Sequence, residues 1–263
     1  MPVVSTDRVE LNYRIDGDAG LPWLVLSNGL GLDLTMWAPQ IPALTPEFRV
    51  LRYDTRGHGA SSTLAQPFAI ERLGRDVLDL LDHAGVARTH FCGFSLGGMI
   101  GMWLGIHAPQ RLNRLVLAHT AARIGPQSMW NERIDTVNAK GMQAISDAAM
   151  RRWFTAGFIA SHPAVVNALK ATMEKTSALG YVSCCAAIRD ADFQDAVARI
   201  SAPTLIISGS QDIATTPGDA HFLAKQIAGA EAVEIDAAHL ANIERPQEFS
   251  EALRTFLGAT KHE

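Results

Sequence analysis

The sequence predicts an α/β fold with a mostly parallel central sheet flanked by helices, and three observations support this class. Short runs rich in β-branched residues alternate with longer amphipathic stretches along most of the chain. Several of the short runs lack polar alternation, as do strands that are buried on both faces of a parallel sheet. The chain of 263 residues, 48% hydrophobic and 19% charged, is long enough to bury one large core.

The strands and helices are expected in regular alternation. The runs that predict strands cover residues 9–15, 23–27, 48–53, 89–92, 112–118, 204–208 and 232–235. The stretches with helical periodicity cover residues 70–83, 96–107, 219–227 and 247–257. Because strands and helices follow one another in this way, the sheet is expected to be doubly wound, with helices on both faces.

One long segment, residues 121–200, interrupts this alternation. It has a helical composition throughout and is too long to be a single crossover helix. We expect a helical cap, inserted after the sixth strand of the fold (112–118), over the carboxyl edge of the sheet, where open α/β sheets bind ligands. Residues 1–120 and 201–263 then form the core. The alternative is that the additional helices pack against the side of the core.

Composition and charge exclude several classes of partner. The net charge of −4 leaves no basic surplus for binding nucleic acid. No apolar stretch approaches the roughly 20 residues that span a bilayer, and the N-terminal segment lacks the pattern of a secretory signal. Three cysteines, an odd and sparse number, do not indicate a disulfide framework. We expect a cytoplasmic protein with no nucleic-acid or membrane partner; the sequence does not determine its oligomeric state.

A G-x-S-x-G motif marks Ser95 as the candidate nucleophile. Gly93-Phe94-Ser95-Leu96-Gly97 lies between a predicted strand and a predicted helix. The turn between them is so tight that the serine adopts strained backbone geometry, and small residues on either side relieve clashes. The N-terminus of the following helix then lies beneath the developing negative charge. This context predicts a serine nucleophile on an α/β-hydrolase fold.

Position along the chain selects the catalytic partners of Ser95. In this fold they follow in the order Ser, Asp, His. Asp212 follows the strand at 204–208 and His239 follows the strand at 232–235, so both are expected at the carboxyl edge of the sheet. Asp212 would hold His239 in the right tautomer, and His239 would take the Ser95 proton.

Two backbone N–H groups are expected to stabilise the oxyanion. One belongs to Leu96, directly after the nucleophile. The other belongs to Leu30, in the loop after the strand at 23–27, where Gly29 and Gly31 let the backbone approach closely.

Other reactive residues have a more ordinary explanation. Asp54 and His58 are a conceivable catalytic pair, but a tight turn braced by Arg56 and His58 is the better interpretation. The remaining rival carboxylates precede the strand at 204–208 on a helical segment, where a solvated face explains them; they are Asp190, Asp192 and Asp195. No Cys/His cluster has metal-ligand spacing, and no glycine-rich loop matches a dinucleotide fingerprint. We therefore expect no metal and no cofactor.

Six stretches distributed over the chain share the pattern of one family. They are 93–99 (GFSLGGM), 120–125 (TAARIG), 152–155 (RWFT), 180–181 (GY), 184–190 (CCAAIRD) and 237–240 (AAHL). Together they resemble the 3-oxoadipate enol-lactonases of the β-ketoadipate pathway of aromatic catabolism. The resemblance implies a serine hydrolase that opens a small anionic lactone with water through an acyl-enzyme. His119 stands where this family is expected to have asparagine; it is a candidate substrate contact or a structural residue.

The acetate arm of such a lactone needs a cation or well-placed donors. Residues 121–200 hold nine Lys/Arg and seven Asp/Glu, so the predicted cap is mildly positive. Arg133 and Arg189 are the candidates for binding the carboxylate. Trp130 and Trp153 are expected either to wall the pocket or to pack inside the cap.

Several functions remain open on the sequence alone. The same triad serves general carboxylesterases, C–C bond hydrolases and perhydrolases. A non-enzymatic receptor on the hydrolase fold can also retain a triad. Ser95 disfavours dehalogenases and epoxide hydrolases, which use an aspartate nucleophile.

Overall fold

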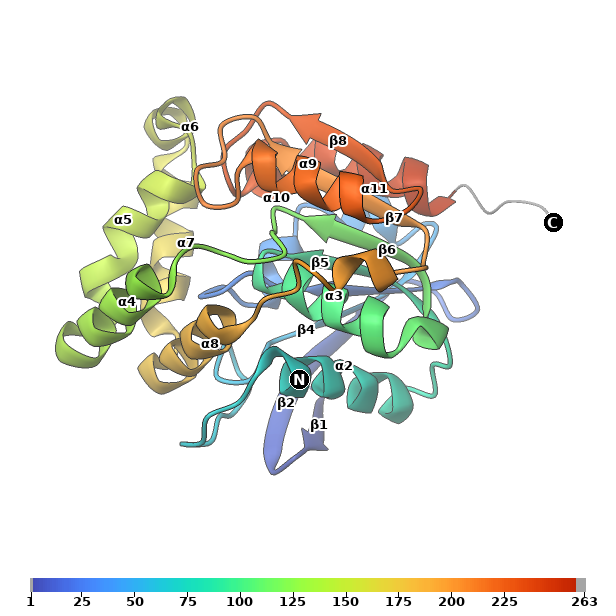
Figure 1. The fold of residues 1–263 in the computed structure, drawn as a ribbon, viewed down its shortest axis with the longest axis horizontal. Coiled ribbons are helices and arrows are strands. Elements are labelled where there is room, and N and C mark those ends of the chain that lie inside the picture. Colours follow the sequence, from blue (N-terminus) through green and yellow to red (C-terminus); the bar gives the residue numbers. More distant parts are fainter. Residues whose placement is uncertain (1, 259–263) are drawn as a thin grey trace.

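A single eight-stranded sheet organises the computed structural model, which describes residues 2–258 (Figure 1). The strands are β1 (Val3–Thr6), β2 (Val9–Asp16), β3 (Trp23–Ser27), β4 (Arg49–Tyr53), β5 (Thr89–Phe94), β6 (Leu112–Ala118), β7 (Thr204–Gly209) and β8 (Glu231–Ile235). The helices are α1 (Ile41–Leu44), α2 (Ile70–His83), α3 (Leu96–His107), α4 (Gln127–Lys140), α5 (Gln143–Trp153), α6 (Ala156–Ser161), α7 (Pro163–Lys175), α8 (Ala178–Asp190), α9 (Pro217–Gln226), α10 (Ala241–Glu244) and α11 (Pro246–Gly258). Short 3-10 helices are η1 (Leu34–Trp37), η2 (Pro109–Arg111) and η3 (Val197–Arg199). The predicted core extended to residues 1 and 259–263, which lie outside the described residues.

The sheet is mostly parallel, as predicted. Its strand order is β1-β2-β4-β3-β5-β6-β7-β8. Every pairing from β4 through β3 to β8 is parallel, and β1 and β2 join one edge as antiparallel strands. Parallel order brings the carboxyl ends of β3, β5, β6, β7 and β8 to the same edge, so the loops that follow them meet there.

Most predicted elements coincide with observed ones. The strands at 23–27 and 112–118 and the helices at 70–83 and 96–107 have the predicted bounds, and the other elements differ by one or two residues at an end. The strand β1 was not predicted. It has four residues at the edge of the sheet, and only Val4 and Thr6 are buried, so the pattern is too short to identify.

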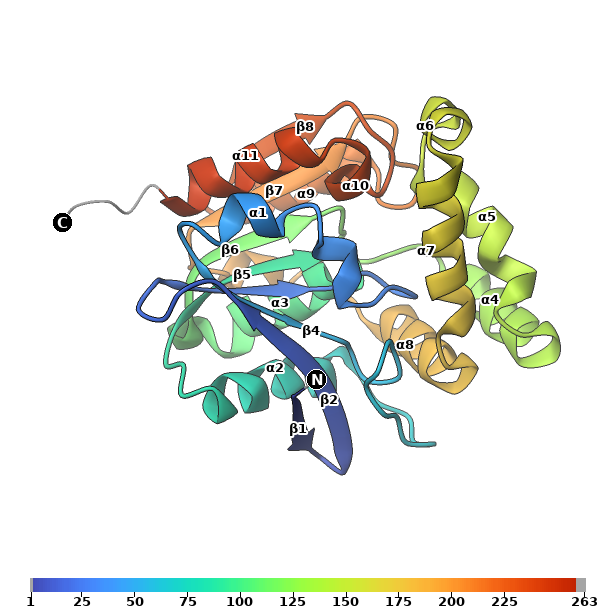
Figure 2. The ribbon, with the colours of Figure 1, turned by 180° about the vertical axis from the view of Figure 1, so that it is seen from behind.

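The helices cover both faces of the sheet. In Figures 1 and 2, α2, α3 and α9 lie on one face, and α1 and α11 lie on the other. The sequence of α2 explains its attachment, because Ile70, Leu73, Val77 and Leu80 recur at helical spacing and are all buried. The doubly wound arrangement expected from the alternation of elements is therefore present.

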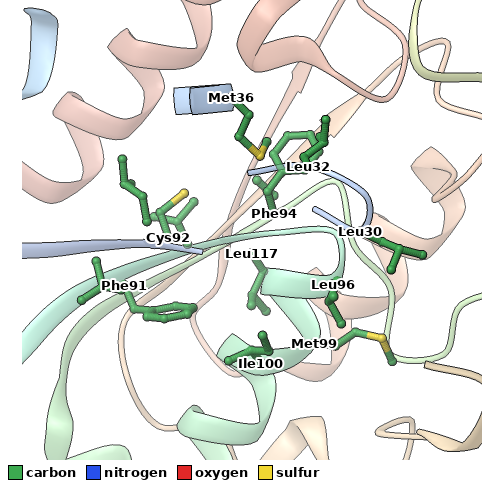
Figure 3. Close-up of a cluster of buried hydrophobic side chains, with 14 of the residues drawn as sticks. Leu30, Leu32, Met36, Phe91, Cys92, Phe94, Leu96, Met99, Ile100 and Leu117 are labelled. Carbon is green, nitrogen blue, oxygen red and sulfur yellow. The ribbon is translucent and has the colours of Figure 1, made fainter. Parts of the chain in front are cut away.

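The strand β5 lies inside the sheet between β3 and β6, and its six residues are all buried. Figure 3 shows its side chains alternating between the two sides of the sheet. Phe91 points toward Ile100 of α3, whereas Cys92 and Phe94 lie on the side of Leu32 and Met36. The turn that joins β5 to α3 is therefore anchored in the centre of the core.

Five helices, α4 to α8, lie between β6 and β7 and gather at one end of the molecule (Figures 1 and 2). Within this group α4 packs against α8 and α5, and α5 packs against α7. Near β8, the Leu240 amide donates a hydrogen bond to the Trp153 carbonyl at the end of α5 (2.9 Å). The loop after β8 is thus tied directly to these helices. No helix within residues 2–258 combines the length and apolarity that crossing a membrane requires.

Candidate active site

Ser95 occupies the sharp turn between β5 and α3, in a conformation that few residues adopt. Its φ of 53° lies in the left-handed region, which is unfavourable for a residue with a side chain. Glycines make the turn possible: a Cβ atom on Gly93 would lie 2.0 Å from the Gly97 carbonyl oxygen, and one on Gly97 would lie 2.3 Å from the Ser27 oxygen. The motif therefore forms the strained turn that the sequence predicts.

Hydrogen bonds on both sides of Ser95 hold this strained backbone. Its amide donates to the Ala118 carbonyl at the end of β6 (2.9 Å). Its carbonyl accepts from the Thr120 hydroxyl (2.8 Å) and from the amides of Gly98 and Met99 in the first turn of α3 (2.9 and 3.1 Å). A strained residue persists where its surroundings fix it in this way, and such residues are concentrated at functional sites.

Asp212 lies in the loop after β7 and is the hub of a buried hydrogen-bond network. Its Oδ1 atom accepts from the amides of Ala214 and Thr215 (2.8 and 3.0 Å). Its Oδ2 atom accepts from the Thr215 hydroxyl (3.0 Å), from His239 Nδ1 (2.7 Å) and from His119 Nδ1 (3.0 Å). Because the carboxyl group is buried, desolvation acts to raise its pKa. The attraction of His239 and the hydrogen bonds from both histidines outweigh burial and hold the pKa of Asp212 well below its usual range.

His239 lies in the loop after β8 and joins this network to an open cavity. Its Nδ1 atom donates to Asp212, so Nε2 remains as the atom that can accept a proton. The ring packs edge-on against Phe94, with ring centres 5.5 Å apart. Ser95 and His239 both line the cavity, and within residues 2–258 no hydrogen bond joins them. Such catalytic contacts often tighten only when substrate binds.

The cavity has a volume of about 680 Å³ and two chemically different walls. One wall, which we call the sheet-edge wall, is formed by residues of the loops after the strands and of the nucleophile turn: Gly29, Leu30, Ser95 and His239. The opposite wall, which we call the helical wall, carries larger and partly charged side chains from α4, α5 and α8: Trp130, Arg133, Arg152, Trp153 and Tyr181. A ligand between them meets reactive groups on one side and cationic and aromatic groups on the other.

The two amides predicted for the oxyanion hole are near the nucleophile. Leu30 follows β3 and lines the cavity, and Leu96 is the first residue of α3. Within the described part of the chain, neither amide donates a hydrogen bond to another backbone group. Both side chains are buried, which fixes the backbone to which they belong. Backbone N–H groups without a partner are rare in folded proteins, and the predicted oxyanion hole requires two of them beside the nucleophile.

Two arginines of the helical wall face the cavity without an acidic partner. Arg133, on α4, lies over the Trp130 ring, with its guanidinium carbon 4.7 Å from the ring centre. Arg152, on α5, is half-buried, and burial together with the nearby charge of Arg133 lowers its pKa. Among residues 2–258, neither forms an ion pair with a carboxylate. The pair presents two positive charges to the cavity, whose lining also includes the carboxylate of Glu132.

The structure brings together some of the predicted binding residues and separates others. Trp130, Arg133 and Trp153 line the cavity. Arg189 does not, because its guanidinium is held by Asp190 and by Asn131 at the surface (2.8 and 2.9 Å). His119 is also outside the cavity lining, and its ring lies in the core against Phe94.

Arg152 and Tyr181 were not predicted as binding residues, although the sequence carries a signal for each, which for Tyr181 is the family-like stretch 180–181. On α5, Ile145, Ala149 and Arg152 recur at helical spacing and all line the cavity. Arg152 also opens the 152–155 stretch. Which face of a cap helix points inward depends on packing between helices, so periodicity alone did not identify this face.

His119, Asp212 and His239 have side chains that could bind a metal, but their distances are those of hydrogen bonds. His119, Asp212 and His239 each offer a ligand atom within 4.8 Å of the others. A zinc ion with bonds of about 2.0–2.2 Å would hold its ligand atoms roughly 3.4 Å apart. The histidine nitrogens instead lie 2.7 and 3.0 Å from one carboxylate oxygen, which are hydrogen-bond distances.

Asp54 and His58, the alternative catalytic pair, belong to a turn that hydrogen bonds and an ion pair hold in place. Asp54 accepts hydrogen bonds from the amides of Leu34 and Ala60 (2.7 and 2.9 Å), and His58 Nδ1 faces the Arg56 carbonyl (3.3 Å). Arg56 forms a two-pronged ion pair with buried Asp76, with both contacts at 2.6 Å. Neither Asp54 nor His58 is among the described residues that line the cavity.

Comparison with known proteins agrees with this geometry. Residues 22–246 match the alpha/beta hydrolase fold family. The chain is 43% identical to 3-oxoadipate enol-lactonase 2 of Acinetobacter baylyi over 97% of this chain and 95% of that protein. It is 38% identical to 3-oxoadipate enol-lactonase 1 of the same organism over 94% of this chain and 92% of that protein. The crystal structure of the enol-lactonase from Burkholderia xenovorans LB400 superimposes with a TM-score of 0.96, at 45% identity over 98% of this chain and 100% of that one.

Proposed function

Because this chain belongs to the alpha/beta hydrolase fold family and, within it, to the 3-oxoadipate enol-lactonases, we propose that it opens 3-oxoadipate enol-lactone with water to give 3-oxoadipate. The reaction is a step of the β-ketoadipate pathway. In this proposal Ser95 is the nucleophile, His239 is the general base and acid, and Asp212 orients His239. No cofactor takes part in the steps that these residues perform.

The first half of the proposed reaction acylates Ser95. His239 Nε2 removes the Ser95 hydroxyl proton while Ser95 Oγ attacks the lactone carbonyl. The 2.7 Å hydrogen bond from His239 Nδ1 to Asp212 supports this role, because it fixes the tautomer whose Nε2 is free to accept a proton. The oxyanion forms beside the Leu30 and Leu96 amides, at the N-terminal end of α3.

The second half opens the ring and releases the product. When the tetrahedral intermediate collapses, the ring C–O bond breaks and His239 returns its proton to the leaving oxygen. That oxygen becomes an enol, a better leaving group than a simple alcohol, and the enol ketonises. Because the ester is cyclic, the leaving group stays attached to the acyl chain. Water activated by His239 then attacks the acyl-enzyme and frees Ser95.

Substrate orientation is assigned to the helical wall. The lactone carries an acetate arm, and a carboxylate leaving water needs a cation or several donors. Within residues 2–258 the guanidinium groups of Arg133 and Arg152 form no ion pair with a carboxylate, and the Arg133 guanidinium lies over the Trp130 ring. Guanidinium groups suit carboxylates because they bind both oxygens. We therefore assign the arm to Arg133 and Arg152 in place of Arg189.

Residues 121–200 act as the cap in this proposal. Their helices supply the aromatic and cationic wall opposite Ser95, which supports a role in closing the site rather than in packing against its side. Cys92, Cys184 and Cys185 are buried and free, which suits a reducing compartment.

The single observation that carries the proposal is the shared cavity: Ser95 and His239 line the same space as Arg133 and Arg152, which form no ion pair within residues 2–258. The test compares kcat/KM for 3-oxoadipate enol-lactone with that for neutral p-nitrophenyl esters. A preference for the lactone is expected, because only the lactone carries a carboxylate for Arg133 and Arg152. Equal or faster turnover of the simple esters would instead identify a general esterase with the same triad.

A further inference from the structure

A second imidazole shares the carboxylate that orients His239. Asp212 Oδ2 lies 2.7 Å from His239 Nδ1 and 3.0 Å from His119 Nδ1. An ionised carboxylate only accepts hydrogen bonds, so His119 Nδ1 must carry a proton and donate it. The other nitrogen, His119 Nε2, is buried and has no partner among residues 2–258. His119 is therefore a neutral ring with its donor aimed at Asp212.

The surroundings of His119 fix this orientation. The ring is 1% exposed and stacks on Phe94, with ring centres 5.0 Å apart and an angle of 20° between the planes. Phe249 lies parallel to it at 6.5 Å. A Cβ atom on Gly209 of β7 would lie 2.5 and 2.6 Å from the Ala237 and Ala238 carbonyl oxygens and 3.1 Å from the His119 ring, so the backbone after β8 requires glycine here and the His119 ring packs closely against it.

The backbone of His119 is strained in the same way as that of Ser95. Its φ is 47°, and its amide donates to the Ile207 carbonyl of β7 (2.8 Å). His119 directly follows the end of β6. Strain of this kind persists only where several contacts impose it, and it is concentrated at functional positions.

Packing alone does not explain a histidine here. Phenylalanine would stack equally well between Phe94 and Phe249 and would bury no polar atom. Histidine instead leaves Nε2 buried with no hydrogen-bond partner among residues 2–258, which is unfavourable in the core. The feature that distinguishes histidine at this position is the Nδ1 donor to Asp212.

We propose that His119 is a positioning residue for the lactone-opening reaction, which holds Asp212 Oδ2 in line with His239 through its Nδ1–H donor. This inference rests on the proposed function of the triad and adds a member to it. His119 acts through Asp212 and His239 and does not touch substrate, since it is not among the described residues that line the cavity. Its loss should therefore lower kcat and leave KM unchanged.

Two substitutions distinguish the effect of the Nδ1–H donor of His119 from that of its aromatic ring. In His119→Asn the amide nitrogen takes the place of Nδ1 and can still donate to Asp212, although the ring is lost. In His119→Phe the ring and its stacking remain, but the donor is lost. We expect His119→Phe to lower kcat about 10- to 100-fold, as for a lost hydrogen bond to a charged group, and His119→Asn to keep most of the wild-type kcat. Wild-type kcat in His119→Phe, or an equal loss in both variants, would overturn the proposal.

Both variants are assayed on 3-oxoadipate enol-lactone and on p-nitrophenyl acetate. Because His119 acts through the triad, the difference between the two variants should appear on both substrates. If the wild type fails on the lactone but cleaves the ester, the assigned substrate is wrong, and the role of His119 is still decided by the ester.

A measurement on the wild type keeps the proposal testable if His119→Phe does not fold. Nitrogen NMR of protein labelled with ¹⁵N-histidine distinguishes the two neutral tautomers of each ring. We expect a neutral His119 with its proton on Nδ1, in the free enzyme at neutral pH. A proton on Nε2 would leave no donor to Asp212 and would refute the assignment.

Discussion

The two walls of the cavity differ in how they are built. The sheet-edge wall comes from loops that follow parallel strands, and hydrogen bonds to neighbouring strands fix its residues, as the bond from the Ser95 amide to Ala118 illustrates. The helical wall comes from helices that pack on one another, and its arginines project from helix faces toward the cavity. The first wall is suited to hold reacting atoms in fixed geometry. The second can vary its side chains without disturbing that geometry.

The separation of chemistry from recognition predicts opposite kinetic effects for the two walls. A change in the sheet-edge wall should lower kcat and leave binding intact. A change in the helical wall should weaken binding of the anionic substrate and leave the triad intact. Substitutions in each wall test this difference.

Replacing the nucleophile should give the largest loss. Ser95→Ala is expected to lower kcat by about 10³- to 10⁶-fold, because the remaining triad members cannot act without the nucleophile. Stopped-flow or steady-state hydrolysis of the enol-lactone measures the loss. Since Arg133 and Arg152 are unchanged, calorimetric titration of the variant with 3-oxoadipate should give the wild-type affinity. Near wild-type turnover would refute the assigned mechanism, and loss of product binding would show that the walls are not independent.

The same difference explains what the sequence could predict. Asp212 and His239 were identified because each follows a strand of a parallel sheet, and strand ends of such a sheet meet at one edge. The strained turn at Ser95 was identified because its glycines sit at fixed offsets. Both signals are local in the sequence, and both place a residue relative to the strands of a regular parallel sheet.

The residues of the helical wall have no comparable positional reference in the sequence, because they do not follow the strands of a regular sheet. Arg189 and Arg152 are both arginines near aromatic residues in the sequence, yet one is held at the surface by Asp190 and the other faces the cavity. The contact between His119 and Asp212 is also beyond local sequence reasoning, since 93 positions separate the two residues. Such outcomes depend on packing angles and on single side-chain orientations, which periodicity does not specify.

Acid should destabilise the sheet region through buried histidines. All four histidines that are buried in the described part of the chain lie outside residues 121–200. Burial lowers the pKa of one of them, His58, to about 4 from the usual histidine value of 6.5. Between these pH values the unfolded chain binds a proton at this position and the folded protein does not, so the free energy of unfolding falls as the pH falls. Over the whole pH range between the two pKa values, the free energy of unfolding falls by about 3 kcal/mol through this histidine.

His58→Asn tests this dependence, because its amide can still donate to the Arg56 carbonyl but does not titrate. Urea unfolding at several pH values measures the free energy of unfolding. The variant should be less stable at pH 8, where the lost ring leaves a cavity, but its stability should fall less steeply between pH 7 and pH 4. If the free energy of unfolding changed with pH equally in the two proteins, His58 would not contribute to the pH dependence of stability.

Removing one arginine of the helical wall should affect binding. Arg133→Met and Arg152→Met are each expected to lower kcat/KM for the enol-lactone about 10- to 100-fold, mainly through KM, because a charged hydrogen bond to the carboxylate is lost. Turnover of neutral p-nitrophenyl acetate should be unaffected. Arg189→Met is the matched control and should behave as wild type, since Arg189 is held at the surface by Asp190 and Asn131. A loss in the control equal to that in Arg133→Met would return Arg189 to the binding site.

The smallest effect, on the free energy of unfolding, is expected from the contact between the helical wall and the sheet-edge wall. Thr155, which begins α6, donates its hydroxyl to buried Glu244, and the same carboxylate accepts from the Ala238 amide beside His239 (3.3 Å). The Thr155 hydroxyl also accepts from the Phe158 amide as the helix cap (3.2 Å). Thr155→Val removes both interactions and should lower the free energy of unfolding by about 1–2 kcal/mol.

Thr172→Val provides the control for this junction, because within residues 2–258 the Thr172 hydroxyl bonds only to the Ala168 carbonyl of its own helix (3.2 Å). Thermal unfolding of both variants, followed by circular dichroism, should show one transition that Thr155→Val lowers and Thr172→Val barely changes. Since Glu244 links the end of α5 to the loop of His239, a single shifted transition means that the helical wall and the sheet-edge wall unfold together. If Thr155→Val instead produced a separate early transition, the helices would form an independent unit, and the difference between the walls would extend from chemistry to stability.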